Sequence, residues 1–262
     1  MSYKCEVLLS SKIVYDERYD CDCREGPCFG DSKLITDYGP QLTTFCVTFP
    51  RIILSEINTH RVFSRNSASS RAIPIEKRIK EVQEDPFIPT YWGKNKKGMS
   101  AQEEIDNKEK AKAAWLEARD HAVEAVLKLK NLQVHKQTTN RLLEPFLWHT
   151  AIITATDWDN FFKLRYHPDA QPEMQMIASM MHSSLANCEP FELYPGLYHI
   201  PMIAKDEHKL DVDLDTLLRI SVARCARVSY LNHNGTRDLD EDIRLYNGLL
   251  ESGHMSPFEH QA

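Results

Sequence analysis

Residues 41–57 read QLTTFCVTFPRIILSEI, and their hydrophobic pattern changes its period at Pro50. Before the proline, apolar side chains alternate with small ones, a period of two that is typical of a half-buried strand. The apolar face carries Phe45, Val47 and Phe49, and the opposite face carries Thr44, Cys46 and Thr48. Pro50 suits the first turn of a helix. The apolar side of that helix would be formed by Ile52, Ile53, Leu54 and Ile57. We therefore predict a strand over 41–49 that leads directly into a helix.

Helical periodicity dominates the rest of the chain. We expect helices at 72–99 (a short one within a long connection), 101–132, 138–143, after Pro172, 217–224, and from Asp238 to a stop at Gly253. The helix after Pro172 carries an apolar stripe that we interpret as core: Met174, Ile177, Met181 and Leu185. A short strand is expected over 5–9 and a loop over 20–40. These elements predict the α+β class, helix-rich with a small antiparallel sheet, as one domain over 1–262.

The composition excludes several classes of protein. The 262 residues are 42% hydrophobic and 27% charged, ordinary values for a globular chain. No apolar run approaches the roughly 20 residues that a membrane helix needs, and the polar start MSYKCEVLLSSK is no signal peptide. Lys and Arg total 32 against 38 Asp and Glu, a net charge of −6, which argues against a binder of nucleic-acid polymers. The seven scattered cysteines indicate reduced thiols. We expect a cytoplasmic protein that does not bind membranes.

Two clusters raise the question of a metal site. Cys21, Cys23 and Cys28 follow the spacing C-x-C-x4-C, but no fourth Cys or His lies nearby, so loop thiols are the favoured interpretation. His254 and His260 are six residues apart with a proline between them, which does not place them on one helical face. We therefore expect no metal.

Residues 60–71 read HRVFSRNSASSR and contain three arginines, one histidine, four serines and one asparagine. At the exit of a helix, such a stretch offers cations, hydroxyls and free backbone N–H groups, which are the groups that bind phosphate. The alternative is a polar surface turn whose arginines are solvated. Composition alone does not choose between the two.

Four segments together resemble the flavin-dependent thymidylate synthases. That family carries the signature Arg-His-Arg-x-x-Ser-x-Asn-x-x-Ser-x-Arg, which corresponds here to residues 59–71 with Thr59 in the first position. Its Ala-Arg-Val-Ser stretch is matched at 226–229, and its Gly-His-x-Thr/Ser-Pro-x-Glu-His stretch at 253–260. Its Leu-Arg…Ala-Gln-x-Glu stretch is matched at 164–173, and the segment 140–145 precedes it. Each motif alone is weak, but the set is strong.

The order of these motifs differs from the family order. In the family, the Ala-Arg-Val-Ser stretch and the Ser-Pro-x-Glu-His stretch precede the signature. Here they lie at 223–230 and 253–260, at the end of the chain. Circular permutation is tolerated when the termini lie close together at the surface. The strand that follows Glu-His in the family corresponds here to 41–49, so we expect the C-terminus to lie near Gln41.

The resemblance implies reductive methylation of deoxyuridylate to thymidylate, with FAD as cofactor and with NADPH and methylenetetrahydrofolate as co-substrates. Arg165 is implied as the catalytic residue that stabilises charge on the pyrimidine. The residues implied to bind the substrate are Glu56, Ser69, Ser70, Arg71, Arg141 and Arg165. Those implied to bind the flavin are His60, Arg61, Asn66, Asn160, Ser229, His254, Ser256 and Glu259. Structural alternatives are that His254 and Glu259 brace the last helix and that Asn160 caps a turn. The family is usually a homotetramer with shared sites.

Departures from the family pattern leave the substrate open. Thr59 removes a cation, and Ser67 replaces a glutamate. Asp169 stands at a usual histidine, and Thr154 and Thr156 stand at an Asn and an Arg that usually hold the flavin. Glu56 stands where the family often has Gln, and a carboxylate suits a ring edge that offers an amino group. Two alternatives therefore accompany thymidylate synthesis: a flavoenzyme that modifies another pyrimidine deoxynucleotide monophosphate such as deoxycytidylate, and a non-catalytic nucleotide-binding protein.

Overall fold

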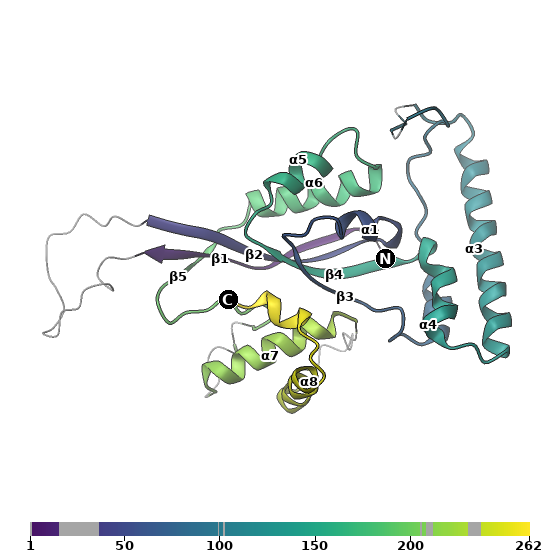
Figure 1. Cartoon of the computed structure of the whole chain (residues 1–262). Coiled ribbons are helices and arrows are strands. Elements are labelled where there is room, and N and C mark those ends of the chain that lie inside the picture. Colours follow the sequence, from purple (N-terminus) through teal and green to yellow (C-terminus); the bar gives the residue numbers. More distant parts are fainter. Residues whose placement is uncertain are drawn as a thin grey trace, which may run out of the picture.

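The computed structural model describes residues 2–15, 37–98, 100, 101, 103–204, 206, 207, 212–229 and 237–262 (Figure 1). The clustered cysteines Cys21, Cys23 and Cys28 lie outside these residues, so their interpretation as loop thiols stays a prediction. Most of the loop expected over 20–40 also falls outside, but residues from Asp37 onward belong to a strand. Among the described residues, no helix is long and apolar enough to cross a membrane.

A sheet of five strands forms the centre of the described chain, in the spatial order β3-β4-β2-β1-β5. The strands are β1 (Lys4–Tyr15), β2 (Asp37–Pro50), β3 (Ser64–Ser67), β4 (Trp148–Ala155) and β5 (Phe191–Leu193). Neighbouring strands are antiparallel, except that β5 pairs in parallel with β1. The helix-rich α+β class is thus confirmed, while the sheet is mixed rather than wholly antiparallel. Both predicted strands exist and are longer than expected, and β3, β4 and β5 were not predicted.

Strand β2 is buried on both faces, so the prediction of a half-buried strand was wrong. Phe45, Val47 and Phe49 are fully buried as expected, but Thr44 on the opposite face is equally buried. The polar face of β2 is covered by a second layer, which a pattern of alternating polarity cannot reveal. Strand β4 was not predicted for a related reason. It is buried along most of both faces, and its sequence WHTAIITA has no regular alternation to read.

The apolar face of the sheet is covered by helices α5 (Asp159–Arg165) and α6 (Pro172–Ala186), as Figure 1 shows. The predicted Met stripe is confirmed as core, since Met174, Ile177 and Met181 are fully buried there. The helix predicted after Pro50 is present as a 3₁₀ turn, η2 (Arg51–Ile53), followed by one α turn, α1 (Leu54–Ile57). Ile53 and Ile57 anchor it in the same core.

A second apolar cluster lies beside the sheet. It joins α2 (Ile75–Glu84), α3 (Lys108–Asn131) and the 3₁₀ helix η3 (Asn140–Phe146), which follows the short α4 (Lys136–Thr139). Helix α3 starts later than predicted because the Asn107 side chain accepts a hydrogen bond from the Lys110 backbone N–H and so caps it. The helix predicted over 138–143 continues through Pro145 as η3, since the change to 3₁₀ geometry accommodates the proline.

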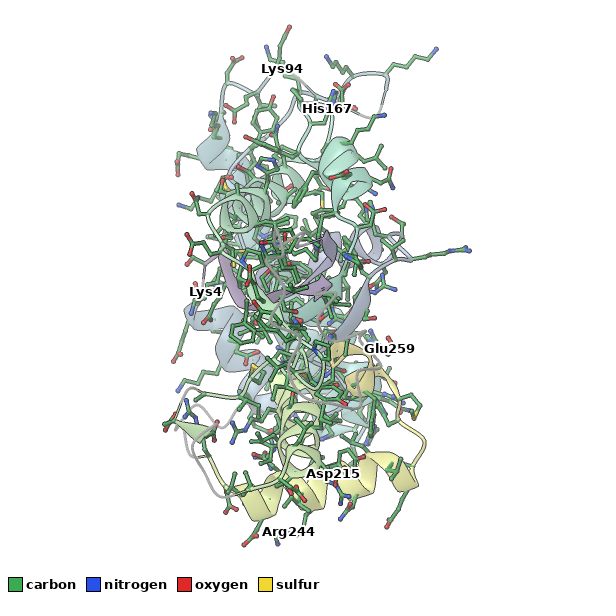
Figure 2. The ribbon with its side chains drawn as sticks, turned by 90° about the vertical axis from the view of Figure 1, so that its left-hand side faces the viewer. Lys4, Lys94, His167, Asp215, Arg244 and Glu259 are labelled. Atoms are coloured by element: carbon green, nitrogen blue, oxygen red, sulfur yellow. The ribbon has the colours of Figure 1, made fainter. Side chains whose placement is uncertain are left out.

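The last helices cover the opposite face of the sheet (Figure 1). These are α7 (Leu214–Ala226), η5 (Arg227–Ser229), α8 (Leu239–Glu251) and η6 (Ser256–His260). Asp238 caps α8, and Gly253 beyond its end adopts a φ of 65°, so both predicted boundaries are confirmed. In the orthogonal view, Lys94 and His167 lie at one end of the molecule, and Asp215 and Arg244 lie at the other (Figure 2). The sheet therefore separates two helical layers.

A chain of buried polar side chains attaches this second layer to the sheet. Ser11 Oγ lies 2.7 Å from His199 Nδ1, and His199 Nε2 lies 2.8 Å from Thr44 Oγ1. Thr44 Oγ1 lies 2.8 Å from Thr154 Oγ1, which is 2.7 Å from His260 Nδ1. The last residue, Ala262, also pairs with the backbone of His199. The end of the chain thus lies near Thr44 of β2, while its predicted proximity to Gln41 stays a prediction.

We predict that acid weakens the fold through this chain. Burial lowers the pKa of His199 and of His260 from 6.5 to about 4, and the charge of His260 lowers the pKa of His199 further. As the pH falls below about 6.5, the unfolded state takes up protons first, so the free energy of unfolding falls until about pH 4. The loss approaches about 3 kcal/mol per histidine. Urea unfolding between pH 7.5 and 4.5 measures it.

His260→Gln should flatten this pH dependence, because one titrating group is lost. His167→Gln removes an exposed histidine and serves as the matched control, with the wild-type slope expected. An unchanged slope in His260→Gln would assign the acid sensitivity to other groups.

Candidate active site

The first part of the site surrounds Arg165 at the end of α5. Its Nη1 donates to Glu56 Oε2 on α1 at 2.9 Å, and its Nη2 donates to Thr59 Oγ1 at 3.3 Å. Its Nε donates to His60 Nε2 at 3.1 Å. The structure therefore brings together three predicted site residues: His60 and Arg165, which lie in separate motifs, and Glu56, which precedes the signature. The guanidinium is fixed by three partners, yet the Arg165 side chain remains 21% exposed and within reach of a ligand.

His60 is held neutral by its surroundings. Its ring is buried, stacks on Phe63 and packs edge-on against Phe161. Burial first, and then the charges of Arg165 and Arg65, lower the pKa of His60 below its usual 6.5. An arginine Nε–H can only donate, so His60 Nε2 is the acceptor and the proton lies on Nδ1. His60 thus orients Arg165 without competing for positive charge.

The second part of the site surrounds Glu144, a residue that the sequence did not single out. Glu144 Oε1 accepts from Ser70 Oγ at 2.7 Å and from Arg141 Nη1 at 2.9 Å, both predicted substrate-binding residues. It also accepts from Arg51 Nη2 at 3.0 Å. Arg71 is exposed, and its guanidinium has no partner among the described residues. Two of the predicted substrate-binding residues, Ser70 and Arg141, are thus close together, but around a carboxylate of the protein itself.

A third contact joins the signature to the relocated motifs. Asn66 on β3 donates from Nδ2 to the Cys225 carbonyl at 2.6 Å, and Ser256 Oγ lies 3.4 Å from Asn66 Oδ1. Burial lowers the pKa of Arg65, and the negative charge of Glu259 only partly offsets this effect. The signature and the C-terminal motif are therefore neighbours in space, although 190 residues separate Asn66 from Ser256.

Other predicted flavin-binding residues contribute no fixed contact. Arg61, Asn160, His254 and Glu259 are exposed, and the side chain of Ser229 is not described. Asn160 does not cap α5, because the Asp157 side chain accepts from the Asp159 backbone N–H there. Thr154 is bonded inside the buried polar chain, so it cannot point a donor toward a cofactor. Thr156 is exposed.

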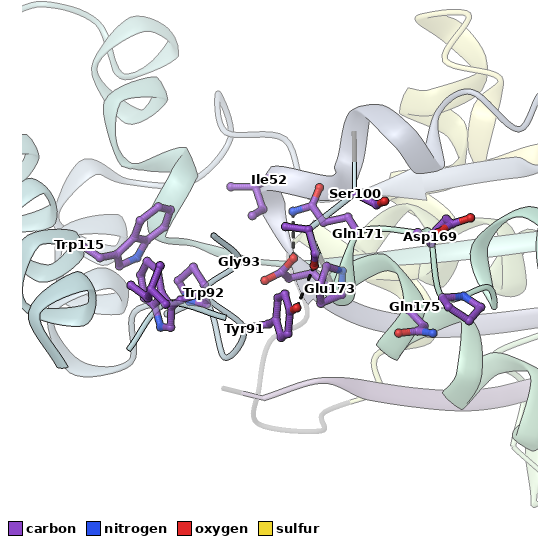
Figure 3. Close-up of a pocket in the computed structure, with 16 residues that line it drawn as sticks. Ile52, Tyr91, Trp92, Gly93, Ser100, Trp115, Asp169, Gln171, Glu173 and Gln175 are labelled. Atoms are coloured by element: carbon purple, nitrogen blue, oxygen red, sulfur yellow. Dashed lines mark hydrogen bonds between the residues drawn. The ribbon is translucent and has the colours of Figure 1, made fainter. Parts of the chain in front are cut away.

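A hollow of about 750 Å³ lies between α3 and the start of α6 (Figure 3). Trp92, Trp115 and Tyr91 line one part of it, and the motif residues Gln171 and Glu173 line another. Gln171 Nε2 donates to the buried Glu173 at 2.9 Å. Arg165 does not line this hollow. The second half of the Leu-Arg…Ala-Gln-x-Glu stretch thus shapes a surface apart from the Arg165 contacts. Within the described residues, no cluster of His, Cys, Asp and Glu could hold a metal ion.

Comparison with known protein families identifies the family of the chain. The model of the thymidylate synthase complementing protein family matches residues 41–191, which is more than half of the chain. The chain therefore belongs to this family, the flavin-dependent thymidylate synthases, and membership implies thymidylate synthase activity in general. The match contains Glu56, His60, Arg141 and Arg165 but ends before the relocated motifs. No match was found among curated proteins.

We predict that Asn66→Ala destabilises the cofactor-free protein by about 1–3 kcal/mol, because the buried Cys225 carbonyl loses its donor. Asn95→Ala, which replaces an exposed asparagine, should change the free energy of unfolding by less than about 0.5 kcal/mol. Chemical denaturation of both variants measures the difference. Equal stability of the two would show that the Asn66 contact does not fix α7 to the signature.

Proposed function

We propose that this protein is an FAD-dependent enzyme that converts deoxyuridylate to thymidylate, with methylenetetrahydrofolate as carbon donor and NADPH as reductant. The observation that carries the proposal is the convergence of Glu56, Thr59 and His60 on Arg165. It joins two family motifs that lie 105 residues apart around one guanidinium. Family membership supports the reaction class.

Arg165 is the group that we assign to the pyrimidine. Its planar fork, held by Glu56 and His60, would face the polar edge of the ring and stabilise the negative charge that develops there. Preorganisation matters because a fixed donor needs no rearrangement when that charge appears. Glu56 keeps a second carboxylate oxygen for the base, since Arg165 is bonded to Oε2.

The residues present fit a flavin dinucleotide, although fewer donors remain than the family usually offers. When bound, FAD supplies the redox chemistry of the reaction. Arg61 and His254, both exposed, precede the neighbouring segments β3 and η6 and would hold the cofactor's anionic groups. Asn66 and Ser256 would shape the same region, while Thr154 is already bonded elsewhere. We expect weaker flavin binding than in a typical relative.

We further infer a cytoplasmic homo-oligomer, by resemblance a tetramer, with sites shared between copies. The support from this chain is the separation of its functional groups. The base-binding group Arg165 belongs to one hydrogen-bonded cluster, and the phosphate-binding group Arg141 belongs to another. Among the described residues of one copy of the chain, the two hydrogen-bonded clusters have no residue in common.

Deoxycytidylate is the second candidate substrate. An ionised Glu56 only accepts hydrogen bonds, so it would suit the exocyclic amino group of cytosine as well as the N3–H of uracil. A non-catalytic nucleotide-binding protein is the third interpretation. It is disfavoured by the fixed yet accessible Arg165, since a buried structural cation would not need to stay open to solvent.

A product assay tests the proposal. Protein supplied with FAD, NADPH and methylenetetrahydrofolate is given deoxyuridylate or deoxycytidylate, and the nucleotides are analysed by mass spectrometry. We expect thymidylate from deoxyuridylate. A methylated or hydroxymethylated product from deoxycytidylate alone would identify the second candidate. Folded, flavin-bound protein that forms no product from either nucleotide would contradict an enzymatic function.

We predict that Arg165→Ala lowers the rate of flavin reoxidation by nucleotide plus folate about 10²–10³-fold, because one charge-stabilising donor is lost. Flavin reduction by NADPH should be unchanged, since that step does not need an activated pyrimidine. Arg165→Lys should recover little, because a lysine ammonium lacks the fixed planar fork with which Arg165 reaches Glu56, Thr59 and His60. Stopped-flow absorbance separates the two half-reactions.

The matched control is Arg244→Ala, which removes an exposed cation from α8 and should leave both half-reactions at the wild-type rate. Normal reoxidation in Arg165→Ala would make Arg165 a structural cation.

A further inference from the structure

The carboxylate of Glu144 lies at the point where three donors meet. Arg51, Ser70 and Arg141 all bond its Oε1, at 3.0, 2.7 and 2.9 Å. They come from three separate segments: η2, the turn after β3, and η3. Donors that converge from different segments on one oxygen form an anion-binding site, and here the bound anion is the protein's own side chain.

Two of the three donors, Ser70 and Arg51, are fixed by groups outside the cluster. Asn140, fully buried, donates to the carbonyls of Ser70 and Ile73 at 2.8 and 2.9 Å and so holds the turn that carries Ser70. Arg51 also donates from Nη1 to His149 Nδ1 at 2.8 Å. Burial and the charge of Arg51 lower the pKa of His149 to about 3, so this ring is a neutral acceptor. Arg51 and Ser70 would therefore keep their positions if Glu144 moved away, while the more exposed Arg141, whose guanidinium bonds Glu144, would be free to follow an incoming anion.

Positive charge exceeds negative charge around Glu144. Arg51 and Arg141 both pair with this one carboxylate, and Arg78 and Arg141 act on Arg51 as like charges. Arg78 has its own partner in Glu81. Arg71 adds a further cation on the neighbouring turn, with no partner for its guanidinium in the described chain. A single carboxylate leaves the cluster net positive, and a dianionic group would neutralise it more completely.

The cluster is open to solvent on one side. The side chain of Glu144 is 23% exposed and that of Arg141 is 54% exposed. Both line a surface hollow of about 450 Å³ together with Arg51 and Asn58. An incoming anion can therefore reach the donors, and Glu144 has room to swing out.

We propose that Glu144 is a specificity-determining residue that occupies the phosphate-binding donors until the phosphate of the substrate displaces it. The inference rests on the proposed function, because it takes the ligand to be a nucleotide monophosphate. Displacement costs the ion pairs of Glu144, so only an anion with more charge and more acceptor oxygens than a carboxylate competes well. Glu144 thus lowers the affinity for phosphate and leaves the affinity for the nucleoside unchanged.

Glu144→Gln tests the inference because it keeps the shape and an acceptor oxygen while removing the charge. Calorimetry measures the binding of inorganic phosphate, deoxyuridylate, deoxycytidylate and the two nucleosides to both proteins. We expect the variant to bind phosphate and the favoured monophosphate about ten- to a hundredfold more tightly, with unchanged nucleoside affinity. Glu84→Gln is the matched control: it removes a surface carboxylate paired with Lys80 and should bind phosphate as the wild type does.

Further variants separate competition from a general change in charge. Arg141→Ala in the Glu144→Gln background should abolish the gain, because the released donor is then missing. If Glu144→Gln does not fold, Glu144→Asp keeps the charge but is too short to hold all three donors, and a smaller gain for phosphate is expected.

The outcomes distinguish this inference from the proposed function. Wild-type protein that forms product, beside a folded Glu144 variant with unchanged phosphate affinity, overturns the role of Glu144 alone. If the variant binds inorganic phosphate more tightly and the wild type turns over no nucleotide, the displacement of Glu144 by phosphate is supported and the proposed reaction is contradicted. No phosphate binding by either protein overturns the inference. An equal gain in Glu84→Gln also overturns it, since net charge would then explain the effect.

Discussion

The buried polar chain from Ser11 through His199, Thr44 and Thr154 to His260 is the constraint on which the rest of the structure depends. Strand β2 lies in the interior of the sheet and is buried on both faces, yet one face carries hydroxyls. Buried hydroxyls without partners are costly, so a second layer can cover that face only if it supplies polar partners. His199 and His260 supply them. The C-terminal segment is therefore part of the core of the fold, although it lies outside the family match.

Local signals allowed much of the fold to be predicted from the sequence. The Asp238 cap, the Gly253 stop and the Met stripe of α6 each depend on residues within a few positions of one another. The failures have a common cause, which is burial on both faces. Thr44 looks like a solvent-facing residue until a histidine 155 positions away covers it, and β4 has no polar face to mark its period. In both strands, packing of other segments against the second face removes the link between burial and the period-two pattern of the sequence.

Residues of the candidate site likewise include some that could be predicted from the sequence and some that could not. His60 and Arg165 could be predicted because each lies in a motif, and Glu56 because it stands where the family often has Gln; the structure then brings the three together. Arg51 and Glu144 could not, because they are 93 residues apart and each resembles an ordinary surface charge. Ser256 and Asn66 were predicted as ligands of the flavin, and in the free protein they bond each other. A sequence motif identifies which residues matter, but their partners in the absence of ligand depend on long-range packing.

The two clusters follow one physical principle, although we propose different parts of a ligand for them. Arg165 is paired with Glu56, and Arg141 is paired with Glu144, so both of these arginines are bonded to a carboxylate of the same chain. An unpaired arginine in an open hollow would attract any anion and would sample many rotamers. A paired one is held in a single orientation and releases its fork only to a group that competes with a carboxylate. In the roles proposed for the two clusters, such pairing lowers the affinity for a ligand and increases the discrimination between ligands. The same pairing explains why a chain with net charge −6 can present arginine-rich surfaces to a phosphorylated ligand: the excess of carboxylates is distributed so that it orients these cations as well as neutralising them.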